Sequence, residues 1–172
     1  MNRWVPMVAV LALGAPAAVA GQDTEWNRYT LENLGGVFVR VDVAEACQGA
    51  GVAAADFEAA VSLKLIEGEV GVLTREEMLR NPALPELRVS VECASGGGGA
   101  TAWVVGLRVQ QAAQMLRNTQ VTLPEAVTWY ATQLGMSAGA NVKEDVEAAV
   151  NGGLDRLVEA WTEANEDEGD GR

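Results

Sequence analysis

The chain has 172 residues, a formal net charge of −12 at neutral pH, no histidine and two cysteines. Such an acidic surface repels phosphate backbones and anionic lipid heads, so we expect no nucleic-acid partner. The lack of histidine excludes Ser-His-Asp and Cys-His catalysis and zinc held by histidine. The length suits one ordinary domain with its own core.

Residues 1–20 have the pattern of a secretory signal peptide. Arg3 precedes a short apolar run, a Gly14 and Pro16 break follows, and Ala18 and Ala20 occupy the −3 and −1 positions of a cleavage site. The alternative, a membrane-spanning helix, needs a longer apolar run. No cysteine stands directly after the cleavage site, which argues against a lipid anchor. We therefore expect an exported protein, periplasmic or secreted, that starts near Gly21 and has no stable membrane anchor.

The first half of the mature chain predicts a strand, a helix and a second strand. Residues 21–35 form a polar lead-in segment, and residues 37–43 alternate valines with other residues, as a half-buried strand does. Apolar residues with helical spacing follow over 53–67 and predict a helix. Residues 70–73 form a short run rich in branched side chains and predict the second strand. Thr74 and Glu77 then match a capping box that opens a short helix. Strand, helix and strand in this order predict a parallel crossover unit.

The second half predicts an antiparallel meander and a closing helix. Residues 86–92, 102–110 and 121–132 alternate again, and apolar residues recur at three- or four-residue steps from 142 to 161. The fold class is therefore α+β, a mixed sheet of about five strands with two main helices on one face. We assign 36–164 to a single domain and 165–172 to an acidic disordered tail.

The glycine run of residues 96–99 raises the question of a phosphate-binding loop. Such a loop needs a following helix and usually a lysine. Here an alternating strand follows, and no basic residue occurs before Arg108. The run predicts a hairpin tip, and we expect no nucleotide or other cofactor.

Two cysteines in an exported chain predict one disulfide, Cys47 to Cys93, between the ends of two neighbouring strands. The alternative, a redox-active or metal-binding pair, is not the simplest interpretation.

Carboxylates remain the main chemical groups, but nothing selects a catalytic pair. Acid–base catalysis needs two acids on facing elements with their pKa values pushed apart, which a sequence does not reveal. We therefore name no catalytic, cofactor-binding or metal-binding residue. Adjacent acids with no assigned role are Asp42 and Glu45, Glu76 and Glu77, and Glu144, Asp145 and Glu147.

Two sets of residues are candidates for contacts. Arg40, Arg88 and Arg108 all lie on the polar faces of predicted strands and could bind an anion if those strands are neighbours. Isolated surface arginines are the alternative. Trp129 and Tyr130 place an aromatic ring on each face of one strand, so we expect one in the core and the other either covered by a helix or exposed as a partner contact.

The arrangement resembles that of exported bacterial α/β envelope domains. These are the amino-terminal part of the Tol translocation protein, the curli-secretion lipoprotein and the outer-membrane activators of penicillin-binding proteins. The resemblance lies in a helix and strand pattern and transfers no functional residue, and the lipid-attachment cysteine of those lipoproteins is absent. The residues that carry it are Phe57, Val61, Leu65, Gly68, Val70 and Val72.

The resemblance implies a noncatalytic envelope protein that works through contacts. From the residues we expect a binding or assembly module acting on a protein partner or on itself, with an unknown oligomeric state. The alternative is a small histidine-free hydrolase that uses paired carboxylates.

Overall fold

The computed structural model describes residues 18–166, apart from the side chains of 18–20 and of residue 97. The predicted signal peptide therefore lies almost entirely outside the described residues, and so does most of the predicted tail. No helix of the described part is long and apolar enough to cross a membrane.

A six-stranded mixed sheet forms the centre of the molecule, in the order β1-β6-β5-β4-β2-β3. Strand β2 is parallel to β3 and β4, whereas β4, β5, β6 and β1 follow one another antiparallel. The α+β class, the parallel unit and the meander are thus confirmed. The strands are β1 (Ala18–Gln22), β2 (Val37–Val43), β3 (Val72–Leu73), β4 (Glu86–Ser95), β5 (Ala100–Gln114) and β6 (Thr122–Ala138).

The prediction of five strands was one short, because β1 comes from residues that we assigned to the signal peptide and the lead-in. Small residues at 18–21 have the pattern of a cleavage site, yet their backbone pairs with β6 from Tyr130 to Leu134. Cleavage after Ala20 would leave two of the five β1 residues, Gly21 and Gln22.

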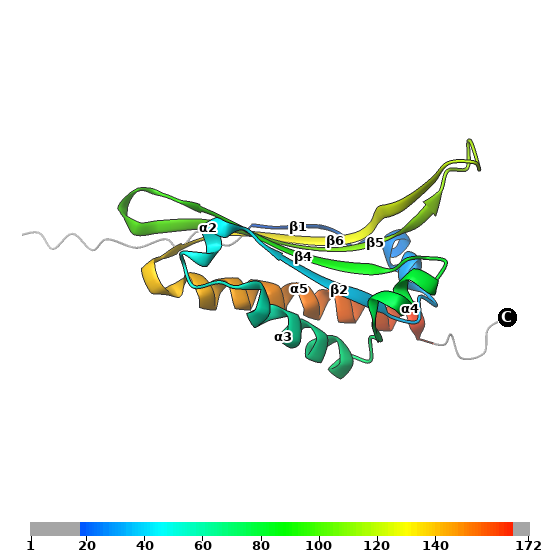
Figure 1. The fold of residues 1–172 in the computed structure, drawn as a ribbon, viewed down its shortest axis with the longest axis horizontal. Helices are drawn as coiled ribbons and strands as arrows, with labels where there is room; N and C mark the ends of the chain where they lie inside the picture. The colour runs from blue at the N-terminus through cyan, green and yellow to red at the C-terminus, as the bar shows by residue number, and fades with distance from the viewer. Residues whose placement is uncertain (1–17, 167–172) are drawn as a thin grey trace, which may run out of the picture.

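Both long helices cover the same face of the sheet, as predicted (Figure 1). Helix α3 (Ala54–Glu67) packs on β2, and α5 (Val142–Asn165) packs on β5 and β6. Buried residues alternate along the strands beneath them, for example Val105, Leu107 and Val109 on β5. At Gly153 of α5 a Cβ atom would lie 2.7 Å from Leu107 Cδ1, so this glycine allows the helix to approach the sheet closely.

Short helices complete the fold. They are α1 (Glu25–Arg28), η1 (Tyr29–Leu31), α2 (Glu45–Gln48), α4 (Arg75–Arg80), η2 (Gly97–Gly99) and η3 (Gly139–Asn141). Thr74 and Glu77 form both bonds of the capping box at the start of α4. The lead-in is part of the core, since Leu31 and Leu34 are buried. The glycine run forms the tip of the β4–β5 hairpin, as expected.

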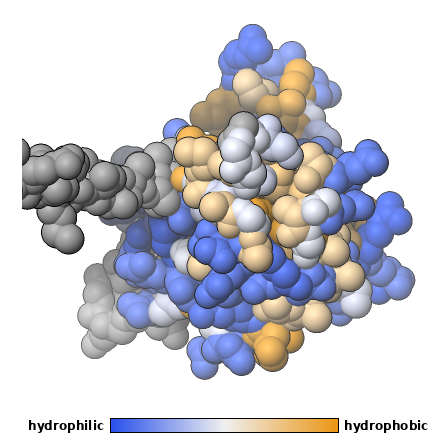
Figure 2. Space-filling view, turned by 90° about the vertical axis from the view of Figure 1, so that its left-hand side faces the viewer, coloured by the Kyte–Doolittle hydropathy of each residue, from blue (hydrophilic) through white to orange (hydrophobic). Residues whose placement is uncertain are grey.

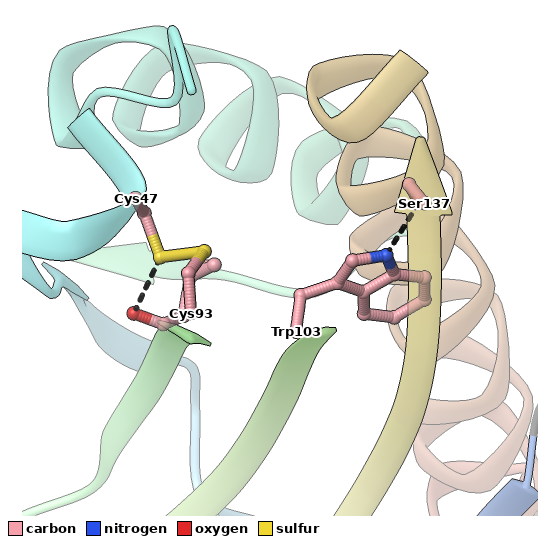
Figure 3. Close-up of a disulfide and its surroundings, with 5 residues drawn as sticks. Cys47, Cys93, Trp103 and Ser137 are labelled. Carbon is pink, nitrogen blue, oxygen red and sulfur yellow. Dashed lines mark hydrogen bonds between the residues drawn. A yellow bond between two sulfur atoms is a disulfide. The ribbon is translucent and has the colours of Figure 1, made fainter. Parts of the chain in front are cut away.

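A disulfide and a tryptophan connect the helices to one end of the sheet (Figure 3). Cys47 of α2 is bonded to Cys93 of β4, which confirms the predicted pair. Trp103 of β5 is the register partner of Cys93, and its indole nitrogen donates to Ser137 Oγ at 2.8 Å. Ser137 in turn donates to Asp145 of α5. Strand β6 therefore runs to Ala138, six residues beyond the end of the strand that the sequence predicts over 121–132.

Two glycine substitutions should change stability in opposite directions. At Gly135 a Cβ would lie 2.1 Å from Cζ2 of the buried Trp103 ring, so Gly135→Ala should overpack the core and cost about 1–3 kcal/mol. Gly152 in α5 is exposed and has nothing within 4 Å of that position, so Gly152→Ala should stabilise the helix by up to about 1 kcal/mol. Urea unfolding of both variants measures this, and equal effects would contradict the packing described.

Candidate binding surface on the uncovered face of the sheet

The face of the sheet opposite α3 and α5 is covered by no helix of the described chain (Figure 1). Alternate residues of each strand point to this face, because side chains along a strand alternate between the two sides. On β6, for example, Trp129 and Ala131 are buried beneath α5, so Tyr130, Thr132 and Leu134 lie on the opposite side. We call this side the uncovered face.

Three arginines form a row across the uncovered face. Arg40 of β2 is the register partner of Arg88 on β4, and Arg88 is the partner of Arg108 on β5. The sequence had left open whether these strands are neighbours, and the topology brings the three residues together. Neighbouring strands are about 4.8 Å apart, so the row spans roughly 10 Å. We call these three residues the arginine row.

Asp42 holds two members of the arginine row in place. Its Oδ2 accepts from Arg88 Nε at 2.6 Å, and its Oδ1 lies 3.5 Å from Arg40 Nε. Arg108 makes no ion pair within the described part of the chain and is exposed. Its Nη2 lies 3.8 Å from the position that a Cβ on Gly106 would take, and Ser90 Oγ lies 2.9 Å from the same position.

The aromatic pair divides as one core residue and one surface residue. Tyr130 lies next to Arg108 on the uncovered face and is half-buried, so it stays a candidate contact. Trp129 is completely buried, so it is the core member of the pair. The reason is the strand alternation, which points its ring toward α5.

Trp129 is fixed by an ionic network formed by Asp23, Arg28 and Glu163. Its indole nitrogen donates to Asp23 Oδ1 at 3.0 Å, and Arg28 Nε donates to the same oxygen at 2.9 Å. Arg28 also pairs with Glu163 of α5. Burial acts to raise the pKa of Asp23, but hydrogen bonds from Arg28 and Trp129 outweigh it and hold that pKa below its ordinary value.

Apolar side chains lie on β6 beyond the arginine row. Leu134 and Met136 are 49% and 75% exposed, and their register partners on β5 are Val104 and Ala102. Figure 2 views the end of the molecule that carries the β4–β5 hairpin, where weakly hydrophobic residues lie among hydrophilic ones. We call Leu134, Met136 and Val104 the β6 apolar patch. Large contiguous apolar patches are often contact surfaces in soluble proteins, so these residues are candidates for contacts.

Most of the adjacent acids named in the sequence analysis have structural partners. Asp42 binds two arginines, Asp145 accepts from Ser137, and Glu76 pairs with Arg80. Hydrogen bonds from the Thr74 backbone and hydroxyl hold the pKa of Glu77 below its ordinary value. Within residues 18–166, no three His, Cys, Asp or Glu side chains are grouped to hold a metal ion.

Sequence reasoning missed two features of β6 and its contacts. The extension of β6 to Ala138 was hidden because glycine and small residues there have the composition of a loop. The buried role of Asp23 had no signal in the sequence, since its partners Arg28, Trp129 and Arg156 come from three separate elements.

Comparisons with known proteins identify no family. No family model matches the chain, and no curated protein is similar to it. Among solved structures, a PelC dodecamer from Paraburkholderia phytofirmans aligns with a TM-score of 0.49 at 16% sequence identity, covering 81% of this chain and 97% of that one.

Replacement of Asp23 should destabilise the fold in a pH-dependent way. Asp23→Asn removes charged hydrogen bonds to Arg28 and Trp129, and we expect a loss of about 1–3 kcal/mol at pH 7. A carboxylate with a lowered folded-state pKa stabilises the protein above its unfolded-state pKa, and this contribution is lost as the pH falls through the folded-state pKa. The difference between wild type and variant should therefore shrink in acid.

Denaturant unfolding at several pH values measures this difference. Glu159→Gln, which removes an exposed acid of α5, is the matched control and should change stability little. A destabilisation by Asp23→Asn that stays constant down to pH 2 would contradict the assignment.

Proposed function

We propose that the protein is a noncatalytic, exported binding or assembly module that acts through protein contacts of its uncovered face. The observation that carries the proposal is the β6 apolar patch, since Leu134 and Met136 expose large apolar side chains on a regular strand. The resemblance to exported envelope domains, which also rests on pattern alone, supports the same class of function.

The β6 edge is the more suitable of the two sheet edges for pairing with another strand. At the opposite edge, β3 has two residues, and such a short edge strand offers little backbone to a partner. Strand β6 has 17 residues, and β1 pairs with five of them. Removal of residues 1–20 as a signal peptide would take away the partners of Thr132, Gln133 and Leu134 and extend the free edge.

A second copy of the chain is the partner that we propose first. Antiparallel pairing of two β6 edges would place Leu134 and Met136 of both copies on one continuous face, and such a self-complementary contact is typical of twofold dimers. The net charge of −12 opposes the approach of two copies. Association should therefore strengthen as salt screens the repulsion.

Polar substitution of the β6 apolar patch should weaken self-association. In a twofold contact each substitution acts twice, so Met136→Gln or Leu134→Gln should raise the dimer dissociation constant at least about tenfold, from the apolar area that is no longer buried. Sedimentation equilibrium of the exported protein measures the constant, with mass spectrometry checking that the chain starts at Gly21.

Leu116→Gln provides the matched control, because Leu116 is 98% exposed and lies in the β5–β6 connection. This variant should associate like wild type. A wild-type protein that stays monomeric at all concentrations and salt levels would contradict self-assembly, and equal effects of all three variants would contradict the assigned surface.

A further inference from the structure

We infer that the arginine row is a binding site for a small polyanion, a ligand with two or more carboxylate or phosphate groups. The site is separate from the β6 apolar patch, and the inference does not depend on the proposed function. It rests on register, on the partners of each guanidinium and on the space beside them.

Register places three like charges side by side on one sheet face. Arg40, Arg88 and Arg108 are consecutive cross-strand neighbours, an arrangement in which like charges repel and cost stability. The rows on either side hold one acid each on this face, Asp42 and Glu86. Asp42 is the one acid of the described chain bonded to the row, and Arg108 makes no ion pair with a described residue.

The hydrogen bonds leave the outer nitrogens of the row available. Asp42 engages Arg40 and Arg88 through Nε in both cases, and Arg108 has no ionic partner within the described residues. Guanidinium groups bind carboxylates and phosphates through two parallel N–H donors. Asp42 therefore positions the guanidinium groups of Arg40 and Arg88, and the guanidinium group of Arg108 is exposed beside them.

The surface beside the row has room for a ligand. Two members of the row, Arg88 and Arg108, line a depression of about 590 Å³ together with Asp42, Ser90 and Glu92, and this depression extends to Val43, Ala44 and Ala54 at the end of β2. Gly106 lies next to Ser90 in register, and the Ser90 hydroxyl occupies the space that a side chain at Gly106 would need. Tyr130 borders the row on β6.

The spacing selects the class of anion. Adjacent guanidinium groups originate about 4.8 Å apart on neighbouring strands, so a single monovalent anion does not contact all three. A ligand that carries several acidic groups along a short chain is long enough to contact more than one of these guanidinium groups. Glu92 lines the same depression, and its negative charge repels such a ligand. Replacement of Glu92 should therefore strengthen binding, whereas replacement of an arginine should weaken it.

Isothermal titration calorimetry with citrate, pyrophosphate and acetate at constant ionic strength tests the inference. Citrate or pyrophosphate should bind more tightly than acetate, and the tighter of the two identifies carboxylate or phosphate as the preferred group. Arg108→Gln and Arg88→Gln should each weaken that binding roughly tenfold or more, from the loss of a charged hydrogen-bonding pair. Arg108→Lys should restore part of the loss, because it keeps the charge without the fork.

Two further variants separate a built site from general attraction. Arg117→Gln makes the same charge change in the exposed β5–β6 connection and should leave binding unchanged, whereas Glu92→Gln should tighten it. Circular dichroism confirms that each variant is folded. Absence of binding by both polyanions, or equal weakening by Arg117→Gln and Arg108→Gln, would overturn the inference.

Discussion

The burial of one set of alternate strand residues beneath α3 and α5 is the constraint on which the rest of the structure depends. Both long helices lie on the same side, so the core is built from one face of the sheet alone. The close approach of Gly153 to Leu107 and of Trp103 to Gly135 brings helix, strand and ring into contact there. The other face consequently carries residues that the core does not need, and these are free to serve contacts.

Two kinds of surface share that free face. Charged residues occupy its middle, where Arg40, Arg88 and Arg108 meet in register, and apolar residues occupy β6 toward the β4–β5 hairpin. The two differ in the ligands they suit, because guanidinium groups bind oxyanions and apolar side chains gain from the exclusion of water. A contact module with both surfaces could respond to a small anion and to another protein chain on the same sheet.

The elements could be predicted from the sequence wherever a regular pattern faces a core. Val37, Val39 and Val41 on β2 and Leu87, Val89 and Val91 on β4 alternate because one side of each strand is buried. The disulfide followed from two cysteines in a chain that we expect to be exported. Strand β1 could not be predicted, since its small residues carry no alternation and its pairing depends on β6, more than 100 residues away.

The candidate site could be predicted only in part. The arginines on the polar faces were recognisable, but their adjacency depends on strand order and register, which local patterns do not determine. Trp129 illustrates the same limit: alternation shows that Trp129 and Tyr130 face opposite sides, and the position of α5 decides which of them is buried.

Hydrogen–deuterium exchange of the purified protein at low and high concentration tests the proposed contact function of the uncovered face most directly. The account predicts that amides of residues 132–138 exchange more slowly in the concentrated sample, while those of β3 at the opposite edge exchange at an unchanged rate. Exchange on β6 that is independent of concentration, or slowing at β3 instead, would contradict it.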